Sequence, residues 1–529
     1  MNKKYYRYYV LSMFLLLTII MTTLCASGLW AQETPVDWFK QGGEAVRRAE
    51  ALDAIEGRAK NVILFVGDGM GMTTVTAARI LEGQQRGQTG EENLLSFEKF
   101  PYTALSKTYA VNQQIPDSAS TMTAIITGVK TNAFMVSVSS SAQTNDCASI
   151  KGNELTTLLE RAEQAGLSTG VVTNTRLTHA TPAAAYAHAA HRQWESDQDL
   201  PKDARNRGCK DIARQLIEFP YGNGLEVAMG GGRTNFLPKD DQDPEDSEKS
   251  GRRRDRRDLT KEWTAQHPDS AYVWNSKQLQ GTDHAKVGHL LGLFSDSHMA
   301  YEHDRPKDKA GEPSLSEMTA SAIAILAKNK RGFVLVVEGG MIDIAHHSGN
   351  AYRALTEAIE MSKAVQVAVE KTKPEETLII VTADHSQPLV MAGYTTRGNP
   401  ILGKVVENDY CTGKCKDSFS KDATGLPYTT LNYAIGPGYT ADSDEHKEVT
   451  KKFKSTQYKG IKAGRPDLTH VDTTAPNYLQ ETVVPLAAVS HAGEDVPIYA
   501  TGPGAHLVHG VMEQNVIYHV MEHALGLSN

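Results

Sequence analysis

Four short runs of β-branched and aliphatic residues most constrain what this chain can fold into. They are apolar throughout instead of alternating with polar residues, which is typical of parallel strands buried between helices. The runs lie at 62–66, 169–173, 333–337 and 378–382. Helical patterns separate them, at 154–165, 316–328 and 351–371. This alternation predicts an α/β fold built on an open sheet with helices on both faces.

Acidic residues and histidines follow three of these four runs, at the place where open α/β sheets bind their ligands. In chain order they are Asp68, Glu338, Asp343, His347, Asp384 and His385. Each one alone is explained as a helix cap or a core histidine. Carboxylates and imidazoles gathered at three strand ends, however, resist burial unless cations neutralise them. The pattern therefore predicts a metal centre, in which mixed His and Asp ligands suit Zn²⁺ and oxygen ligands suit Mg²⁺.

The first strand end also carries a glycine-rich loop, 67–71, which allows a second interpretation. Glycines after a strand are typical of dinucleotide-binding folds, but the spacing here is G-x-G-x-G rather than G-x-G-x-x-G. Asp68 within the loop would also direct a negative charge at a pyrophosphate. A metal ligand fits the loop better, because glycines let the backbone come close to a bound ion.

Ser118 is the candidate nucleophile. It follows Pro116 and Asp117 at the predicted start of a helix of small residues. Free N–H groups and the helix dipole favour an anion at that position, and a nearby metal would stabilise the alkoxide. The alternative is that Asp117 or Ser118 only caps the helix.

Three further side chains complete the predicted site. Thr181 offers an oxygen ligand, and Arg192 offers a planar fork for two phosphate oxygens, although either could be a surface residue. His491 precedes another predicted strand, 496–500, and supplies one more imidazole.

Seven motifs, taken in this order, resemble the alkaline phosphatase family, and its animal-type branch in particular. They are Gly67-Asp68-Gly69-Met70-Gly71, Asp117-Ser118-Ala119, His179-Ala180-Thr181-Pro182, Val337-Glu338-Gly339-Gly340, the pair Asp343 and His347, Thr382-Ala383-Asp384-His385-Ser386, and His491-Ala492-Gly493-Glu494-Asp495. The resemblance implies hydrolysis of phosphate monoesters, with broad specificity, to an alcohol and inorganic phosphate at alkaline pH. Ser118 would form a covalent phosphoserine, Arg192 would bind two phosphoryl oxygens, and His179 would stand near the magnesium-bound waters.

The resemblance also implies two zinc ions and one magnesium ion. One zinc would be held by Asp343, His347 and His491. The second would be held by Asp68, Asp384 and His385. The magnesium would be held by Asp68, Thr181 and Glu338. A further calcium site would use Glu245, Phe294 and Glu312, although Ser295 replaces a carboxylate there.

The family's architecture is a three-layer sandwich with a large, mostly parallel central sheet, helices on both faces and a crown-like insertion. Here the insertion would span 393–489 within a catalytic domain of residues 32–529. The family forms homodimers, and an amphipathic helix predicted at 36–54 would embrace the second subunit; a packed terminal helix explains that pattern equally well. Met341, Ile344 and Gln387 depart from the family's usual residues near the site.

Residues 1–31 are predicted to be a signal peptide, with a basic start, an apolar run at 10–24 and small residues after it. An uncleaved anchor is the alternative. The mature chain would be exported, periplasmic or secreted, with no membrane contact. Lys and Arg total 55 against 63 Asp and Glu, a balance of −8 that argues against a nucleic-acid partner.

Four cysteines would remain after the signal is removed: Cys147, Cys209, Cys411 and Cys415. An even number in an exported chain predicts two disulfides, the close pair clipping one loop and Cys147 bonding Cys209 by elimination. A four-cysteine zinc site is the alternative. Lastly, the mixed-charge run at 240–258 predicts a solvated loop, with an anion-binding patch as the other interpretation.

Overall fold

The computed structural model describes residues 34–407, 419–423, 425–438 and 465–527. The predicted signal peptide, Cys411 and Cys415 lie outside the described residues. The chain divides into two compact units after Asp53. In the first unit, helix α2 (Pro35–Glu50) is capped by Thr34 and Asp37 and buries none of its side chains. Among the described residues of both units, no helix is long and apolar enough to cross a membrane.

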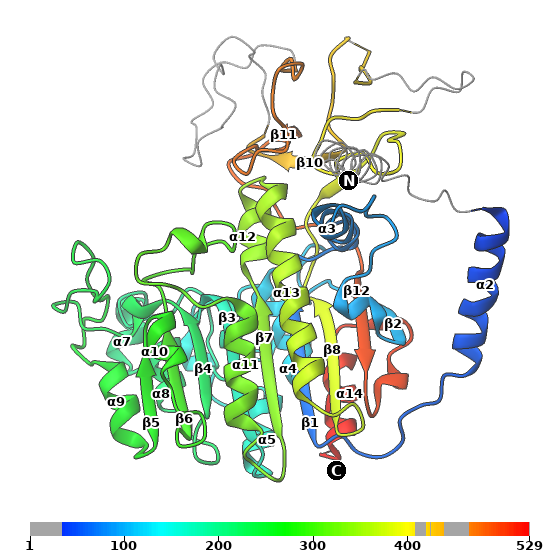
Figure 1. Ribbon diagram of the computed structural model, residues 1–529. Helices are drawn as coiled ribbons and strands as arrows, with labels where there is room; N and C mark the ends of the chain where they lie inside the picture. The colour runs from blue at the N-terminus through cyan, green and yellow to red at the C-terminus, as the bar shows by residue number, and fades with distance from the viewer. Residues whose placement is uncertain (1–33, 408–418, 424, 439–464, 528–529) are drawn as a thin grey trace, which may run out of the picture. The chain divides into compact units, whose positions relative to one another are not determined.

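A ten-stranded sheet forms the centre of the second unit (Figure 1). Its order is β13-β2-β12-β8-β1-β7-β3-β4-β6-β5. The strands are β1 (Asn61–Gly67), β2 (Tyr102–Lys107), β3 (Ser168–Arg176), β4 (Val227–Gly231), β5 (Ser270–Val273), β6 (His289–Leu293), β7 (Phe333–Gly339), β8 (Thr377–Ala383), β12 (Val496–Thr501) and β13 (Gly510–Glu513). Among them β12 alone runs antiparallel to its neighbours. The four apolar runs of the sequence are β8, β1, β7 and β3, which lie side by side at the centre of the sheet.

Helices cover both faces of this sheet because successive side chains of a strand point to opposite sides. Val62, Leu64 and Val66 of β1 face one hydrophobic cluster, and Ile63 and Phe65 face the other. The first cluster includes side chains of α4 (Ser118–Thr127), α5 (Leu158–Gln164), α6 (Ala180–Ala183), α7 (Lys202–Asn206), α8 (Ile212–Ile217), α9 (Leu259–Gln266) and α14 (Val516–Leu525). The second includes α3 (Met72–Gln85), α10 (Ser276–Gln280), α11 (Leu315–Leu326), α12 (Met341–His347) and α13 (Ala351–Lys371). The predicted three-layer α/β sandwich is confirmed.

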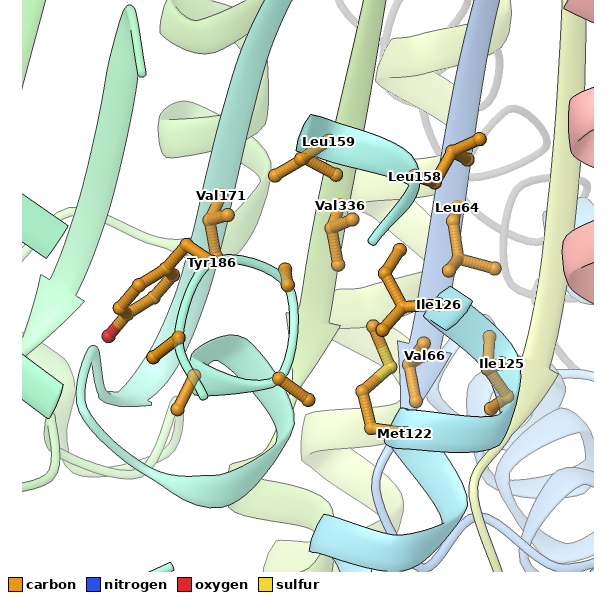
Figure 2. Close-up of a cluster of buried hydrophobic side chains, with 14 of the residues drawn as sticks. Leu64, Val66, Met122, Ile125, Ile126, Leu158, Leu159, Val171, Tyr186 and Val336 are labelled. Atoms are coloured by element: carbon orange, nitrogen blue, oxygen red, sulfur yellow. The ribbon is translucent and has the colours of Figure 1, made fainter. Parts of the chain in front are cut away.

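Figure 2 shows how the first cluster closes over the centre of the sheet. Met122, Ile125 and Ile126 of α4 lie against Leu64 and Val66 of β1. Every residue of α4 is buried, so the small side chains at its start are required for close packing. This packing fixes the helix that begins at Ser118 directly against the strand that ends before Asp68.

A separate three-stranded sheet comprises β9 (Leu389–Met391), β10 (Leu431–Gly436) and β11 (Thr482–Pro485). Strand β10 pairs antiparallel with β9 and parallel with β11. Two of the three strands fall within 393–489, the predicted crown-like insertion, and the boundaries of that insertion stay a prediction.

The Cys147–Cys209 disulfide is confirmed, and it excludes a zinc site made of all four cysteines. The prediction of a solvated loop at 240–258 is wrong for Arg253, whose side chain is fully buried. Arg253 donates to both oxygens of buried Asp211, at 2.9 and 3.0 Å, and also to Asp255. The arginine run therefore fastens its loop to the domain at this point.

Candidate metal and phosphoryl-transfer site

Three adjacent strands bring the predicted ligands together. Strand β1 pairs with β7 on one side and β8 on the other, all parallel, so their carboxyl ends meet at one edge. Asp68 follows β1, Glu338 is the penultimate residue of β7, and Asp384 and His385 follow β8. Short helix α12 begins just beyond β7 and carries the remaining acid, Asp343.

Asp68, Asp384 and His385 form the first group of converging ligand atoms. All three side chains are fully buried, and one ligand atom of each lies within 4.8 Å of the others. His385 Nε2 is 3.2 Å from Asp384 Oδ2 and 3.4 Å from Asp68 Oδ1. These are the three residues predicted to hold the second zinc.

Asp343, His347 and His491 form a second group beside the first. His347 Nε2 is 3.0 Å from Asp343 Oδ2 and 3.2 Å from His491 Nε2. The other ring nitrogen of each histidine faces a backbone carbonyl: Nδ1 of His347 is 2.5 Å from the oxygen of Val489, and Nδ1 of His491 is 2.8 Å from that of Pro116. Carbonyls oriented in this way hold the proton on Nδ1 and leave Nε2 free as a ligand.

Asp68, His179 and Glu338 form a third group within the same 4.8 Å limit. Thr181 donates to Asp68 Oδ2 at 3.3 Å, so the predicted magnesium ligands are brought together. Glu338 Oε2 accepts from Thr173 and, at 2.9 Å, from Thr175. His179 was predicted only near magnesium-bound waters, and the structure places it within reach of the ligand oxygens themselves.

Electrostatics favour a cation in the first and third groups. In the second group the charge of Asp343 outweighs burial and raises the pKa of His347 to about 9, so a metal ion there would displace a proton from that imidazole. Burial raises the pKa of Glu338 to about 7 and of Asp384 to about 6. Burial and then the charges of Asp384 and Asp343 raise the pKa of Asp68 well above its usual value. Burial lowers the pKa of His385 to about 4. The raised pKa values show that these buried carboxylates are disfavoured as anions without a nearby positive charge, which a divalent cation would supply. The His385 imidazole stays neutral and able to ligate.

Two buried atoms support the same conclusion. Glu338 Oε1 and His385 Nδ1 have no hydrogen-bond partner among the described residues. Buried polar atoms of this kind need a water, an ion or a ligand. The donor set, with its carboxylates, imidazoles and one hydroxyl, therefore fits zinc and magnesium.

The glycine-rich loop makes this convergence possible. Gly69 has φ of +69°, and a Cβ there would lie 2.9 Å from Asp343 Oδ1. Its amide donates to Asp384 Oδ1 at 3.0 Å. The loop therefore brings backbone against the ligand carboxylates, as the metal interpretation requires.

Ser118 is the first residue of α4, and its Oγ lies 3.1 Å from His385 Nε2 and 3.4 Å from Asp68 Oδ1. Asp117 caps the helix by accepting from the amides of residues 119 and 120. Arg192 donates through Nη1 to Asp117 Oδ2 at 3.0 Å and through Nη2 to His179 Nε2 at 2.9 Å. Asp117 is thus the cap, and Ser118 is available to react beside two candidate ligands.

Of the side chains that support these ligands, the sequence analysis singled out Gln387 alone, as a departure from the family's usual residues, and it did not single out Thr121 or Thr173. Thr121 donates to Asp384 Oδ2 at 3.2 Å, and Gln387 donates to Asp343 Oδ1. Thr173 lies opposite Glu338 in the pairing of β3 with β7. The register of that strand pair was the only signal for Thr173, and the sequence does not provide it.

The predicted calcium ligands are not part of the three converging groups. Glu245 accepts from buried Arg233 at 2.9 Å. Burial raises the pKa of Glu312 to about 7, to which the charges of Asp308 and Glu245 add. Phe294 is buried in the core. The structure adds Asp308 and the cation Arg233 to this region, and a calcium ion there stays a prediction.

Comparison with known proteins agrees with this geometry. The family model described as alkaline phosphatase matches residues 59–527. The chain belongs to the alkaline phosphatase family. It is 44% identical over 518 residues to the tissue-nonspecific alkaline phosphatase of Gallus gallus, covering 96% of this chain and 93% of that protein. It is also 44% identical over 497 residues to an alkaline phosphatase of Gadus morhua, covering 93% and 97%.

Solved structures share the fold. The alkaline phosphatase of Thermus thermophilus has a TM-score of 0.62 at 24% identity, covering 90% of this chain and 93% of that one. That of the Antarctic bacterium TAB5 has a TM-score of 0.58 at 20% identity, covering 89% and 99%. The predicted resemblance to alkaline phosphatases is confirmed. The chain is an enzyme of this metal-dependent family, and phosphate monoesters are the substrates that fit it.

Proposed function

We propose that this enzyme hydrolyses phosphate monoesters through a covalent phosphoserine at Ser118, at a site with two zinc ions and one magnesium ion and with an alkaline pH optimum. One observation carries the proposal. The Ser118 hydroxyl lies within 3.4 Å of Asp68 and within 3.1 Å of His385, and these two side chains belong to the converging ligand groups.

The ligands divide by chemistry. Asp343, His347 and His491 would hold one zinc, and Asp68, Asp384 and His385 the other. Asp68, Thr181 and Glu338 would hold magnesium, with His179 beside them. Bound divalent ions supply charge that favours an ionised oxygen nucleophile and stabilises negative charge on the phosphoryl oxygens.

The chain's own residues position the two displacements. The Ser118 oxygen attacks phosphorus and forms an ester while the bond to the alcohol breaks, and the serine proton leaves with the alcohol. Water then attacks the same phosphorus, releases phosphate and returns a proton to the serine oxygen. Two in-line displacements retain configuration at phosphorus.

Arg192 orients the phosphoryl group in both steps. Asp117 and His179 each accept from one terminal nitrogen of its guanidinium, which retains further N–H donors. A guanidinium held at two points presents these donors to phosphoryl oxygens without losing side-chain entropy on binding. The start of α4 adds helix N–H groups and a positive dipole end.

The enzyme would act as an exported homodimer. The Cys147–Cys209 disulfide suits an oxidising compartment, in agreement with export to the periplasm or beyond the cell. Helix α2 exposes Val36, Trp38 and Phe39, an apolar face that a second subunit would cover. Sedimentation of the mature chain with and without residues 32–53 tests this role for α2.

The test of the reaction is hydrolysis of a chromogenic phosphomonoester from pH 7 to 11, before and after chelation, with Zn²⁺ and Mg²⁺ restored. Acid quenching and mass spectrometry should find phosphate on Ser118, and Ser118→Ala should remove both the adduct and the turnover. Faster hydrolysis of a phosphodiester or a sulfate ester than of the monoester would replace this proposal with a related hydrolase. Activity that survives chelation would contradict the metal assignment.

A further inference from the structure

A partly exposed aromatic pair borders the predicted phosphoryl site and has no part in the reaction described above. The rings of Phe134 and His191 are stacked, with centroids 5.6 Å apart and planes within 13°. Phe134 is 42% exposed although it is a large apolar residue. His191 directly precedes Arg192 in the chain.

Main-chain hydrogen bonds attach this pair to the catalytic residues. The Phe134 amide donates to Asp117 Oδ1 at 2.9 Å, and the Arg192 amide donates to the Phe134 carbonyl at 2.8 Å. Asp117 is the neighbour of Ser118 and the partner of the Arg192 guanidinium. The ring is therefore fixed to both the nucleophile's helix and the phosphate-binding arginine.

The backbone at Phe134 is also unusual. Its φ is +68°, in the left-handed region that large side chains rarely adopt. The surrounding structure holds it there: two hydrogen bonds join Val136 to Ala189, at 2.9 and 3.0 Å, and so tie the segment of Phe134 to the segment of His191. Strained residues of this kind occur at binding sites, where they present a side chain in a fixed orientation.

The chemistry of the pair points to a planar partner. Burial and then the charge of Arg192 lower the pKa of His191, so its ring is neutral at the alkaline pH of the reaction. Two stacked uncharged rings offer an apolar face beside an otherwise ionic site. Aromatic rings bind one another by offset or edge-to-face contact, which a flexible aliphatic alcohol does not reproduce.

We propose that Phe134 and His191 form a leaving-group subsite that favours phosphate monoesters of planar aromatic alcohols. The inference rests on the proposed function, because the subsite acts only on a phosphoryl group bound at Ser118 and Arg192. The subsite binds the alcohol portion, so it affects KM and kcat/KM. It leaves kcat unchanged wherever hydrolysis of the phosphoserine, a step common to all substrates, limits turnover.

The experiment compares Phe134→Gly with the wild type on naphthyl phosphate and on glycerol phosphate. Glycine accepts the positive φ, so the variant removes the ring without adding strain. We expect KM for the aromatic ester to rise about three- to tenfold and KM for the aliphatic ester to stay unchanged. For each substrate the KM of the variant is divided by the KM of the wild type, and this ratio cancels the difference in reactivity between the two leaving groups.

Three further variants control this comparison. Phe134→Tyr retains a ring and should keep the low KM for the aromatic ester. Phe134→Asn tolerates the left-handed backbone but lacks the ring, so it should behave like Phe134→Gly. Arg256→Gly is the control for the glycine substitution itself: Arg256 is another exposed residue with a positive φ, 60°, and lies in the arginine-rich loop. This variant should change neither KM.

Each outcome decides the inference. An equal rise in KM for both esters, or no rise for the aromatic ester, overturns the subsite while leaving the hydrolase intact. Hydrolysis of neither ester by wild-type enzyme loaded with Zn²⁺ and Mg²⁺ overturns the proposed function itself. A rise in KM for a hexyl ester equal to that for the naphthyl ester would show simple apolar contact and contradict stacking.

Discussion

Replacing Arg253 by alanine should destabilise the enzyme far more than replacing Arg256, three residues further along the same arginine run. Arg253 is fully buried and donates through Nη1 and Nη2 to the two oxygens of Asp211, which is itself buried. Arg256 lies 81% exposed, and its nearest acid is 3.7 Å away. The two variants remove the same charge from the same loop and differ in burial.

The magnitude follows from what each variant leaves behind. Arg253→Ala leaves Asp211 buried without its cation, and removing one partner of a buried pair costs about 3–5 kcal/mol. Asp211 also caps α8, so its displacement would loosen that helix as well. Arg256→Ala removes an exposed ion pair, which contributes about 0–1 kcal/mol.

The assay is thermal and urea unfolding of both variants at fixed Zn²⁺ and Mg²⁺, because bound metals add to apparent stability. Asp211→Asn and the double variant complete a cycle that isolates the coupling of the pair. The kcat of folded Arg253→Ala should equal that of the wild type, since neither Arg253 nor Asp211 contacts the candidate site. Equal unfolding midpoints for the two alanine variants would refute the reasoning.

Three further predictions follow from the site and the core. Arg192→Ala should raise both KM and the inhibition constant of phosphate by about 10- to 100-fold, because a hydrogen bond to a charged group contributes roughly 1.5–3 kcal/mol. Steady-state assays with phosphate as inhibitor measure both constants. Glu338→Gln should weaken binding of Mg²⁺ more than that of Zn²⁺, measured by equilibrium dialysis; equal weakening would contradict the magnesium assignment. Burial, followed by the charge of Glu226, raises the pKa of Glu163 from 4.5 to about 8. Between those two pH values the folded state binds a proton that the unfolded chain has already lost, so the stability of the fold falls as pH rises. The melting temperature of Glu163→Gln should therefore fall less between pH 6 and pH 9 than that of the wild type.

The sequence predicted the central strands, and it predicted that acids and histidines gather at their ends, because both depend on local information. An apolar run is buried whatever lies beside it, and the acids that follow β1, β7 and β8 reach one edge once those strands are parallel. The helix of α13 was predicted with its bounds, 351–371, because its apolar spacing persists over many turns. Strand order and register were not accessible, since they depend on which segments pair.

The same distinction explains the error at the arginine run. Residues 252–258 are seven consecutive charged residues, a pattern that predicts a solvated segment unless one of them pairs with a buried acid elsewhere in the fold. Asp211 lies 42 residues before Arg253, and only the folded domain brings the two side chains together. A sequence shows the composition of such a loop but gives no indication of the partner that buries part of it.

Asp117 shows how far such non-local contacts organise the site. From the sequence it is one of two candidate caps of the helix, the other being Ser118. In the fold its carboxylate caps α4, accepts from the Phe134 amide and pairs with the Arg192 guanidinium. These contacts outweigh the effect of burial and keep the pKa of Asp117 low, so it stays charged, whereas the pKa values of nearby buried carboxyls are raised. A single anion thereby orients the nucleophile, the phosphate-binding group and the exposed aromatic ring, and motifs distant in the chain become one site.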